Sequence, residues 1–247
     1  LRTLTVIRDA EAAIQKKDPS FSIRKLDYDD AATYKMLGQG ETEGVFQLES
    51  SGMKQVLVGL QPQNLEDVIA LISLYRPGPM DSIPTYLRNR HEPDKISYKT
   101  PQLAHILDVT NGCIVYQEQV MQIFRELAGF SFGQADNVRR AMSKKKHAVM
   151  EAEREHFVHG CTEPGHECPG CVANGISEEV ANEIYDEMSS FASYAFNKSH
   201  AACYAYVAFQ TAYLKCHYPS EFMAALLTSV LDNTCLLYTS PSPRDRQ

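Results

Sequence analysis

The stretch AACYAYVAFQTAYLKC, residues 201–216, decides the fold class, because it is apolar on almost every side of a helix. A helix with one apolar stripe lies on a surface, whereas a helix that is apolar all round is buried. We therefore expect a buried central helix here, stopped by Pro219, which cannot continue it. Gln210 and Thr211 interrupt the apolar run, so this stretch is not a membrane span.

Apolar residues recur at helical spacing along most of the remaining chain. Asp27 or Asp29 is expected to cap a short helix that stops near Gly38 or Gly40. Ser131 and Gln134 fit a capping box in front of a basic helix. Further helices are predicted in residues 1–14, 45–60, 68–72, 103–107, 120–127, 150–158, 180–191 and 222–231. Residues 112–116 are expected to form a short strand or turn, so the fold class is mainly α, a multi-helix domain with short or no β-strands.

Composition narrows the class of protein further. The 247 residues carry a net charge of −7 and are 44% apolar, which is too large and too apolar for a disordered chain. One large domain or two modest ones are expected. Seven cysteines, three of them in residues 161–171, favour reduced thiols or a metal site over a disulfide framework. With no signal peptide at the start, we expect a cytoplasmic protein without a membrane segment, and a fragment, since residue 1 is not Met.

A basic run, RRAMSKKK, occupies residues 139–146 and holds five cations without an acid. On a helix Arg140 and Lys144 are neighbours, and such like-charge pairs repel by roughly 0.2–0.5 kcal/mol each. A triphosphate or a nucleic-acid backbone opposite the run would relieve this repulsion, with arginine as a bidentate clamp. The alternative is a solvated cationic face paired with nearby glutamates.

The run FNKSH, residues 196–200, lies between two apolar helices. Ser199 is expected to be the N-cap of the second helix, whose N-terminus favours anions. Lys198 and His200 add hydrogen-bond donors. The alternative is a capped turn whose histidine is merely exposed.

Three cysteines and a histidine form a candidate zinc site at Cys161, His166, Cys168 and Cys171. Two residues between Cys168 and Cys171 let both sulfurs face one ion, and a Cys3His set completes a structural zinc site. His159 could replace His166. The alternative is a loop with loose thiols. By contrast, the carboxylates of residues 27–30 precede a helix as caps and are not expected to hold catalytic metals.

Longer motifs carry a family resemblance. They are GVFQLES at 44–50, LYRPGPM at 74–80, YQEQVMQ at 116–122, AD at 135–136 with RRAM at 139–142 and KKK at 144–146, FA at 191–192 with Tyr194, FNKSH at 196–200, QTAYLK at 210–215, and YP at 218–219 with FMAA at 222–225. Together and in this order they resemble the alpha subunit of bacterial DNA polymerase III, the C-family replicative DNA polymerase. The resemblance covers nearly all of residues 1–234.

The resemblance implies a place within such a polymerase. Residues 1–20 look like the helix that follows the palm, and residues 21–234 look like the mostly helical fingers domain. The three catalytic aspartates of the family lie upstream, so no catalytic residue is expected in this fragment, which is predicted to be inactive alone. The Mg²⁺ ions of the parent enzyme would likewise have their ligands outside it.

The resemblance also implies roles for individual residues. Arg139 and Arg140 would contact the deoxynucleoside triphosphate, with Lys144 and Lys145 in a secondary role. The incoming nucleotide and the primer end would lie near four residues, Asn197, Lys198, Ser199 and His200. Arg76 and Tyr116 are weaker candidates for nucleotide or DNA contacts. The implied partners of the parent protein are primer–template DNA, the other replicative polymerase subunits and the sliding clamp.

Two features depart from the family pattern. A shorter loop usually stands where residues 161–171 lie, so structural Zn²⁺ rests on ligand spacing alone. Residues 235–247 resemble the translated read-through of a sequencing adaptor, and we set them aside as an artefact tail.

A rival function from another class is a helical, zinc-stapled interaction domain that binds RNA or a protein partner through its basic helix.

Overall fold

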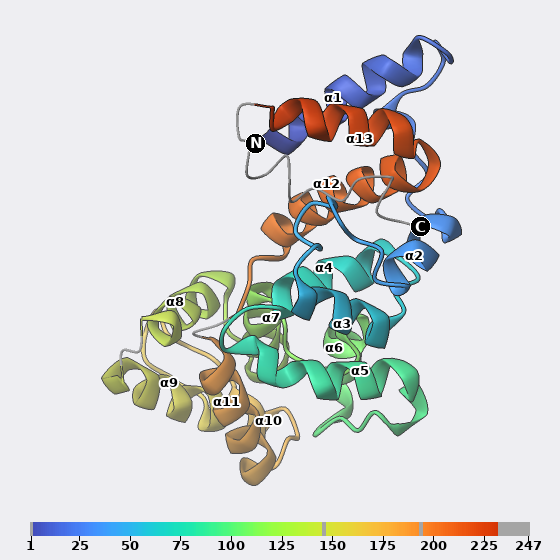
Figure 1. Ribbon diagram of the computed structural model, residues 1–247. Coiled ribbons are helices and arrows are strands. Elements are labelled where there is room, and N and C mark those ends of the chain that lie inside the picture. The colour runs from blue at the N-terminus through green and yellow to red at the C-terminus, as the bar shows by residue number, and fades with distance from the viewer. Residues whose placement is uncertain (1, 145–146, 193–194, 232–247) are drawn as a thin grey trace. The chain divides into compact units, whose positions relative to one another are not determined.

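The fold is helical wherever the chain is described. The computed structural model describes residues 2–144, 147–192 and 195–231, and in these ranges it contains thirteen α-helices joined by turns and short 3-10 segments (Figure 1). Within the same ranges β structure is limited to two isolated bridges, Tyr116 with Phe196 and Cys161 with Cys168. The mainly α prediction is therefore confirmed. The tail at residues 235–247 lies outside the described residues.

The chain divides into two compact units, and the division falls within α4 (Leu65–Leu74) and α12 (Lys198–His217). One unit comprises the residues up to Ile72 together with those from Ala202 onward, and the other is Ser73–Ala201. None of the described helices combines the length and the apolarity needed to cross a membrane.

The first unit is built around α1 (Arg2–Gln15) and α13 (Pro219–Ser229), which lie side by side (Figure 1). Ile7 and Ile14 of α1 are buried in one cluster with Phe222 of α13. Leu4 of α1 does not join this cluster, since it is 51% exposed. Pro219 is the first residue of α13, where its missing N–H costs no helical hydrogen bond.

Two helix starts in this unit differ from the prediction. Helix α2 (Ala31–Gly38) is capped by Asp30, whose Oδ2 accepts a hydrogen bond from the Thr33 N–H at 2.8 Å, and not by Asp27 or Asp29. Helix α3 (Ser51–Leu60) begins only after Ser50, whose Oγ accepts from the Met53 N–H at 3.3 Å. In both places the side chain that reaches the N3 amide sets the start, which the apolar spacing does not reveal.

The predicted central helix is present as α12, but it is not buried all round. Ala205, Ala208 and Phe209 are buried, whereas the Tyr206 side chain is 45% exposed. The exposed residues Ser199, Cys203 and Tyr206 recur at helical spacing along one side of α12. The expectation of complete burial is therefore corrected to burial of one broad face.

The second unit carries the residues of the candidate site. Its helices are α5 (Ile83–His91), α6 (Ala104–Leu107), α7 (Gln117–Ala128), α8 (Phe132–Ser143), α9 (His147–His159), α10 (Gly170–Ala173) and α11 (Glu178–Ala192). Their core contains Phe124, Phe157 and Tyr185, whose rings meet with centroid distances of 5.0 to 6.0 Å. Helix α5 was not predicted, because Pro84 and the polar residues of its sequence IPTYLRNRH obscure the short apolar spacing of Ile83 and Tyr86, which are buried.

Candidate functional site

Two distant segments of the second unit run alongside each other at the start of α7. The Gln117 N–H donates to the Phe196 carbonyl at 2.9 Å, and the Phe196 N–H donates to the Val115 carbonyl at 3.2 Å. These bonds form the parallel bridge between Tyr116 and Phe196. Of the short strand or turn expected at residues 112–116, the structure has a turn at 111–112 and a single bridge at Tyr116, and that bridge holds Phe196 beside the start of α7.

The N-terminus of α12 is capped by residues of its own segment and of α7. Asn197 Oδ1 accepts from the His200 N–H at 2.9 Å, so Asn197, not Ser199, is the N-cap. The Glu118 carboxylate accepts from Asn197 Nδ2 at 2.9 Å and from the Lys198 N–H at 3.1 Å. A helix N-terminus favours such a negative charge. Glu118 is a site residue that the sequence analysis missed, although it lies within the motif YQEQVMQ.

Cations lie over aromatic rings in this region. The Arg76 guanidinium carbon is 4.3 Å from the centre of the Phe196 ring, and Lys198 Nζ is 5.2 Å from the centre of the Tyr116 ring. Both distances are within the range of cation–π attraction. Burial lowers the pKa of Arg76, which nevertheless remains a cation. Tyr116 is only 1% exposed, so it supports Lys198 from within the unit.

Helix α8 presents the basic residues. It begins with the predicted capping box of Ser131 and Gln134, which is confirmed. Arg139 donates to Asp136 Oδ1 through Nε at 3.0 Å and through Nη2 at 2.8 Å, and Arg140 Nη2 lies 2.7 Å from Asp136 Oδ2. The hydrogen bonds from Arg139 hold the pKa of Asp136 below its ordinary value. An acid of the same helix thus faces the two arginines.

The two arginines differ in exposure. The Arg139 side chain is 17% exposed and also donates from Nη1 to Gln117 Oε1 at 3.1 Å, whereas the Arg140 side chain is 65% exposed. Lys144 is exposed as well and forms the C-cap of α8. Lys145 lies outside the described residues. Arg139 therefore fastens α8 to α7, and Arg140 with Lys144 faces solvent.

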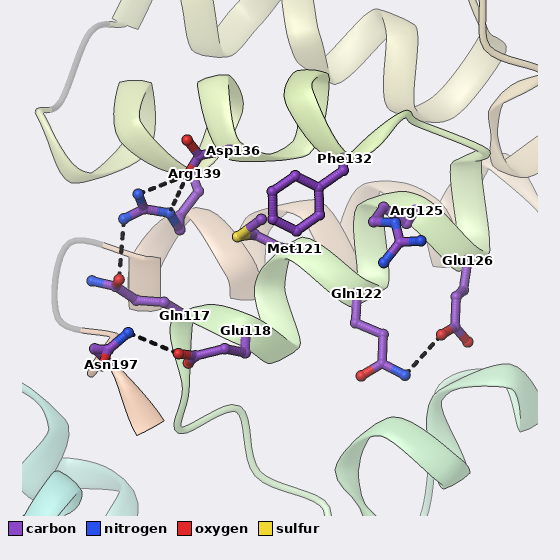
Figure 2. A pocket seen from close by; sticks show the side chains of 10 residues that line it. All are labelled: Gln117, Glu118, Met121, Gln122, Arg125, Glu126, Phe132, Asp136, Arg139 and Asn197. Carbon is purple, nitrogen blue, oxygen red and sulfur yellow. Dashed lines mark hydrogen bonds and ion pairs between the residues drawn. The ribbon is translucent and has the colours of Figure 1, made fainter. Parts of the chain in front are cut away.

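A cavity of about 520 Å³ opens between α7 and α8. Figure 2 shows Arg139 reaching both Asp136 and Gln117 along its wall, with Asn197 beside Glu118. The lining residues are Gln117, Glu118, Met121, Gln122, Arg125, Glu126, Phe132, Asp136, Arg139 and Asn197.

The structure thus brings most of the predicted site residues of the second unit together. Asn197 and Arg139 line one cavity, while Tyr116, Lys198 and Arg76 are linked through the Tyr116–Phe196 bridge. The His200 ring contacts the Phe196 ring at 5.4 Å between centroids, and Ser199 is exposed in the first turn of α12.

The predicted zinc ligands are arranged differently. Cys161 and Cys168 exchange two backbone hydrogen bonds of 2.9 Å, while His166 is exposed. Burial raises the pKa of Cys171 to about 12 and also raises that of Cys168. Across the described residues no three His, Cys, Asp or Glu side chains are placed to hold a metal ion. Structural zinc in this loop stays a prediction.

Backbone contacts close the cysteine loop. Gly160 and Gly170 have φ of +88° and +79°, and a Cβ on Gly170 would lie 2.3 Å from the Gly160 nitrogen. Only glycine permits both this approach and these angles without strain. The close approach of Gly160 and Gly170, together with the backbone hydrogen bonds between Cys161 and Cys168, can therefore hold the loop's conformation without a metal.

Comparison with known proteins identifies the class and then the family. The family model described as bacterial DNA polymerase III alpha subunit finger domain matches residues 3–165. The chain is 49% identical over 234 residues to DNA polymerase III subunit alpha of Thermus aquaticus, covering 92% of this chain and 18% of that protein. It is 44% identical over 232 residues to DNA polymerase III subunit alpha of Staphylococcus aureus (strain COL), covering 94% of this chain and 21% of that protein.

These matches define a polymerase fingers domain, and the chain belongs to the bacterial DNA polymerase III alpha subunit family. The chain spans about a fifth of the length of the curated relatives it matches.

Proposed function

We propose that this chain is the fingers region of a replicative DNA polymerase, which binds the incoming deoxynucleoside triphosphate and the primer–template. The observation that carries the proposal is the pair on α8, in which Arg139 is fastened to Asp136 and Gln117 while Arg140 projects into solvent. Membership of the DNA polymerase III alpha family supports the reaction class.

The cations of α8 have the chemistry that a triphosphate requires. Arg140 is held by one carboxylate oxygen, so a phosphate group can compete with Asp136 for its guanidinium. Arg139 donates hydrogen bonds to the same Asp136 carboxylate, which fixes the position of its positive charge. Lys144, the C-cap of α8, would add charge as a secondary contact, and Lys145 is proposed for the same role from the family resemblance. The ionised Asp136 keeps both arginines oriented before the nucleotide arrives.

The segment at residues 197–200 would serve the nucleotide and the primer end. Asn197 is engaged by Glu118, and the Lys198 ammonium lies over Tyr116, so their positions are set before any ligand binds. His200 and Ser199 stand on the first turn of α12. Arg76, packed on Phe196, supports this segment and is a weaker candidate for a direct contact.

The chemical step is assigned to other parts of the parent protein. Two Mg²⁺ ions supply activation of the primer hydroxyl and stabilisation of the leaving pyrophosphate in such enzymes. The described residues of this chain do not fit a magnesium centre, since no three suitable side chains converge. We propose that the catalytic aspartates lie in the parent protein outside this chain, as the family resemblance implies. Contacts with the other polymerase subunits and the sliding clamp belong to the same proposal, as does a cytoplasmic location.

A template-directed extension assay tests the proposed function. The complete polymerase subunit should extend a primer in the presence of Mg²⁺ and all four nucleotides, whereas the purified chain alone should not. A complete subunit without extension activity, or extension by the chain alone, would contradict the proposal. RNA binding without extension would favour the rival interaction domain.

A further inference from the structure

An exposed aromatic ring marks a part of the cavity that the proposed nucleotide contacts do not use. Phe132 is 65% exposed, more than any other large apolar side chain in the described part of the chain. It is the first residue of α8, directly after the Ser131 cap. The capping box of Ser131 and Gln134 fixes this first turn, and the ring is therefore held at the cavity.

The surroundings of the ring form a stacking platform. Figure 2 shows the Phe132 ring beside Met121, with Arg125 on the neighbouring turn of α7. The Arg125 guanidinium carbon is 5.9 Å from the ring centre. An exposed aromatic face next to an arginine is the arrangement on which single-stranded nucleic acids stack their bases.

The rim of the cavity suits a neutral, flat ligand with polar edges. It holds three carboxylates, from Glu118, Glu126 and Asp136, against the two guanidinium groups of Arg125 and Arg139. Away from Arg139, the lining holds Glu118 and Glu126 against Arg125, and this charge balance disfavours phosphate beside Phe132. The side-chain amide of Gln122 donates from Nε2 to Glu126 Oε1, and its Oε1 can accept a hydrogen bond from a base edge.

We propose that this cavity receives an unpaired nucleobase of the single-stranded template, which stacks on Phe132 beside Arg125. The inference rests on the proposed polymerase function. The base of an incoming nucleotide is engaged in pairing, so the unpaired bases of a primer–template are those of the template overhang. Phe132 and Arg140 are eight residues apart on α8, or about 12 Å, so phosphates outside the cavity can lie along the same helix.

Affinity for primer–templates with different overhangs tests the stacking platform in the complete polymerase. Two duplexes that differ only in having a one-nucleotide or a ten-nucleotide template overhang are compared by fluorescence anisotropy. Phe132→Ala should weaken binding of the long overhang by about 5- to 150-fold, the range expected for one lost stacked base, and leave the short overhang unchanged. Phe132→Trp should bind the long overhang like the wild type.

Phe132→Leu keeps apolar bulk without an aromatic face and should behave like Phe132→Ala. An abasic site moved along the overhang should lower wild-type affinity at one position and have no further effect there in Phe132→Ala. Equal binding of both overhangs by Phe132→Ala, Phe132→Leu and the wild type would overturn the stacking proposal alone. A wild-type enzyme that binds neither duplex would instead contradict the proposed function.

Discussion

Asn197 donates a hydrogen bond from Nδ2 to Oε1 of Glu118 at 2.9 Å, across 79 residues of sequence. The same carboxylate accepts from the Lys198 N–H, so one side chain of α7 joins the first turn of α12 to the start of α7. The segment that carries Lys198 and His200 is therefore positioned by an acid. The positions of these proposed nucleotide contacts therefore depend on the hydrogen bonds between the Glu118 carboxylate and the N-terminus of α12.

Substitutions at this contact should separate charge from shape. Glu118→Gln keeps the shape and removes the negative charge, and we expect it to lower the free energy of unfolding by about 1 kcal/mol. Asn197→Asp should lower the free energy of unfolding by more than Glu118→Gln does, because a second carboxylate then faces Glu118 in place of the amide donor. Urea unfolding followed by circular dichroism measures both. A variant Asn197→Asp as stable as the wild type would show that the contact is not formed.

The ion pair between Asp136 and Arg139 predicts that the stability of the protein depends on pH. Hydrogen bonds from Arg139 lower the pKa of Asp136 in the folded protein, so its contribution is fully present above the unfolded pKa and is lost as pH falls through the folded pKa. The difference in the free energy of unfolding between wild type and Asp136→Asn should therefore be constant near pH 7 and shrink below about pH 4. A difference that does not change between pH 7 and pH 2 would contradict this account.

Two glycines of the cysteine loop give a matched comparison. Gly165 and Gly170 both have positive φ, but a Cβ on Gly165 meets nothing within 4 Å, whereas one on Gly170 meets the backbone of Gly160. Gly165→Ala should lower the free energy of unfolding by about 1 kcal/mol through backbone strain alone. Gly170→Ala should lower the free energy of unfolding by clearly more, since the backbone of Gly160 must move to make room for the new Cβ. Equal costs, measured by urea unfolding, would mean that the loop does not close through this contact.

Metal analysis of the purified protein tests the zinc prediction. A structural zinc site would give one zinc per chain, and Cys171→Ser would remove it along with the associated stability. Zinc far below one per chain, with unchanged unfolding after chelation, would assign the loop's shape to its backbone hydrogen bonds instead.

The sequence predicted the features that arise from local rules. The capping box of α8 and the mainly α class follow from side chains near each other in the chain. The caps Asp30 and Asn197 were missed because several neighbouring polar residues could have reached the N3 amide, and only the backbone path decides among them. Helix α5 was missed because its sequence is mixed and contains Pro84, and burial of only Ile83 and Tyr86 stabilises it against its neighbours.

Long-range relationships were not accessible from spacing. The Tyr116–Phe196 bridge, the role of Glu118 and the cavity beside Phe132 require segments far apart in sequence to meet. The motif resemblance grouped several of these residues without giving their geometry. It assigned Arg139 and Arg140 the same role, whereas their exposures of 17% and 65% separate a fastened arginine from one that faces solvent.

Steady-state kinetics of Arg140→Ala in the complete polymerase test whether Arg140 contacts the triphosphate of the incoming nucleotide. Losing a charge-assisted phosphate contact should lower kcat/KM for nucleotides by about 10- to 100-fold, with a raised KM, for all four nucleotides alike. Lys95→Ala, which removes another exposed cation of the same unit, is the matched control and should leave the kinetics unchanged. Wild-type kcat/KM for all four nucleotides in Arg140→Ala would contradict the account.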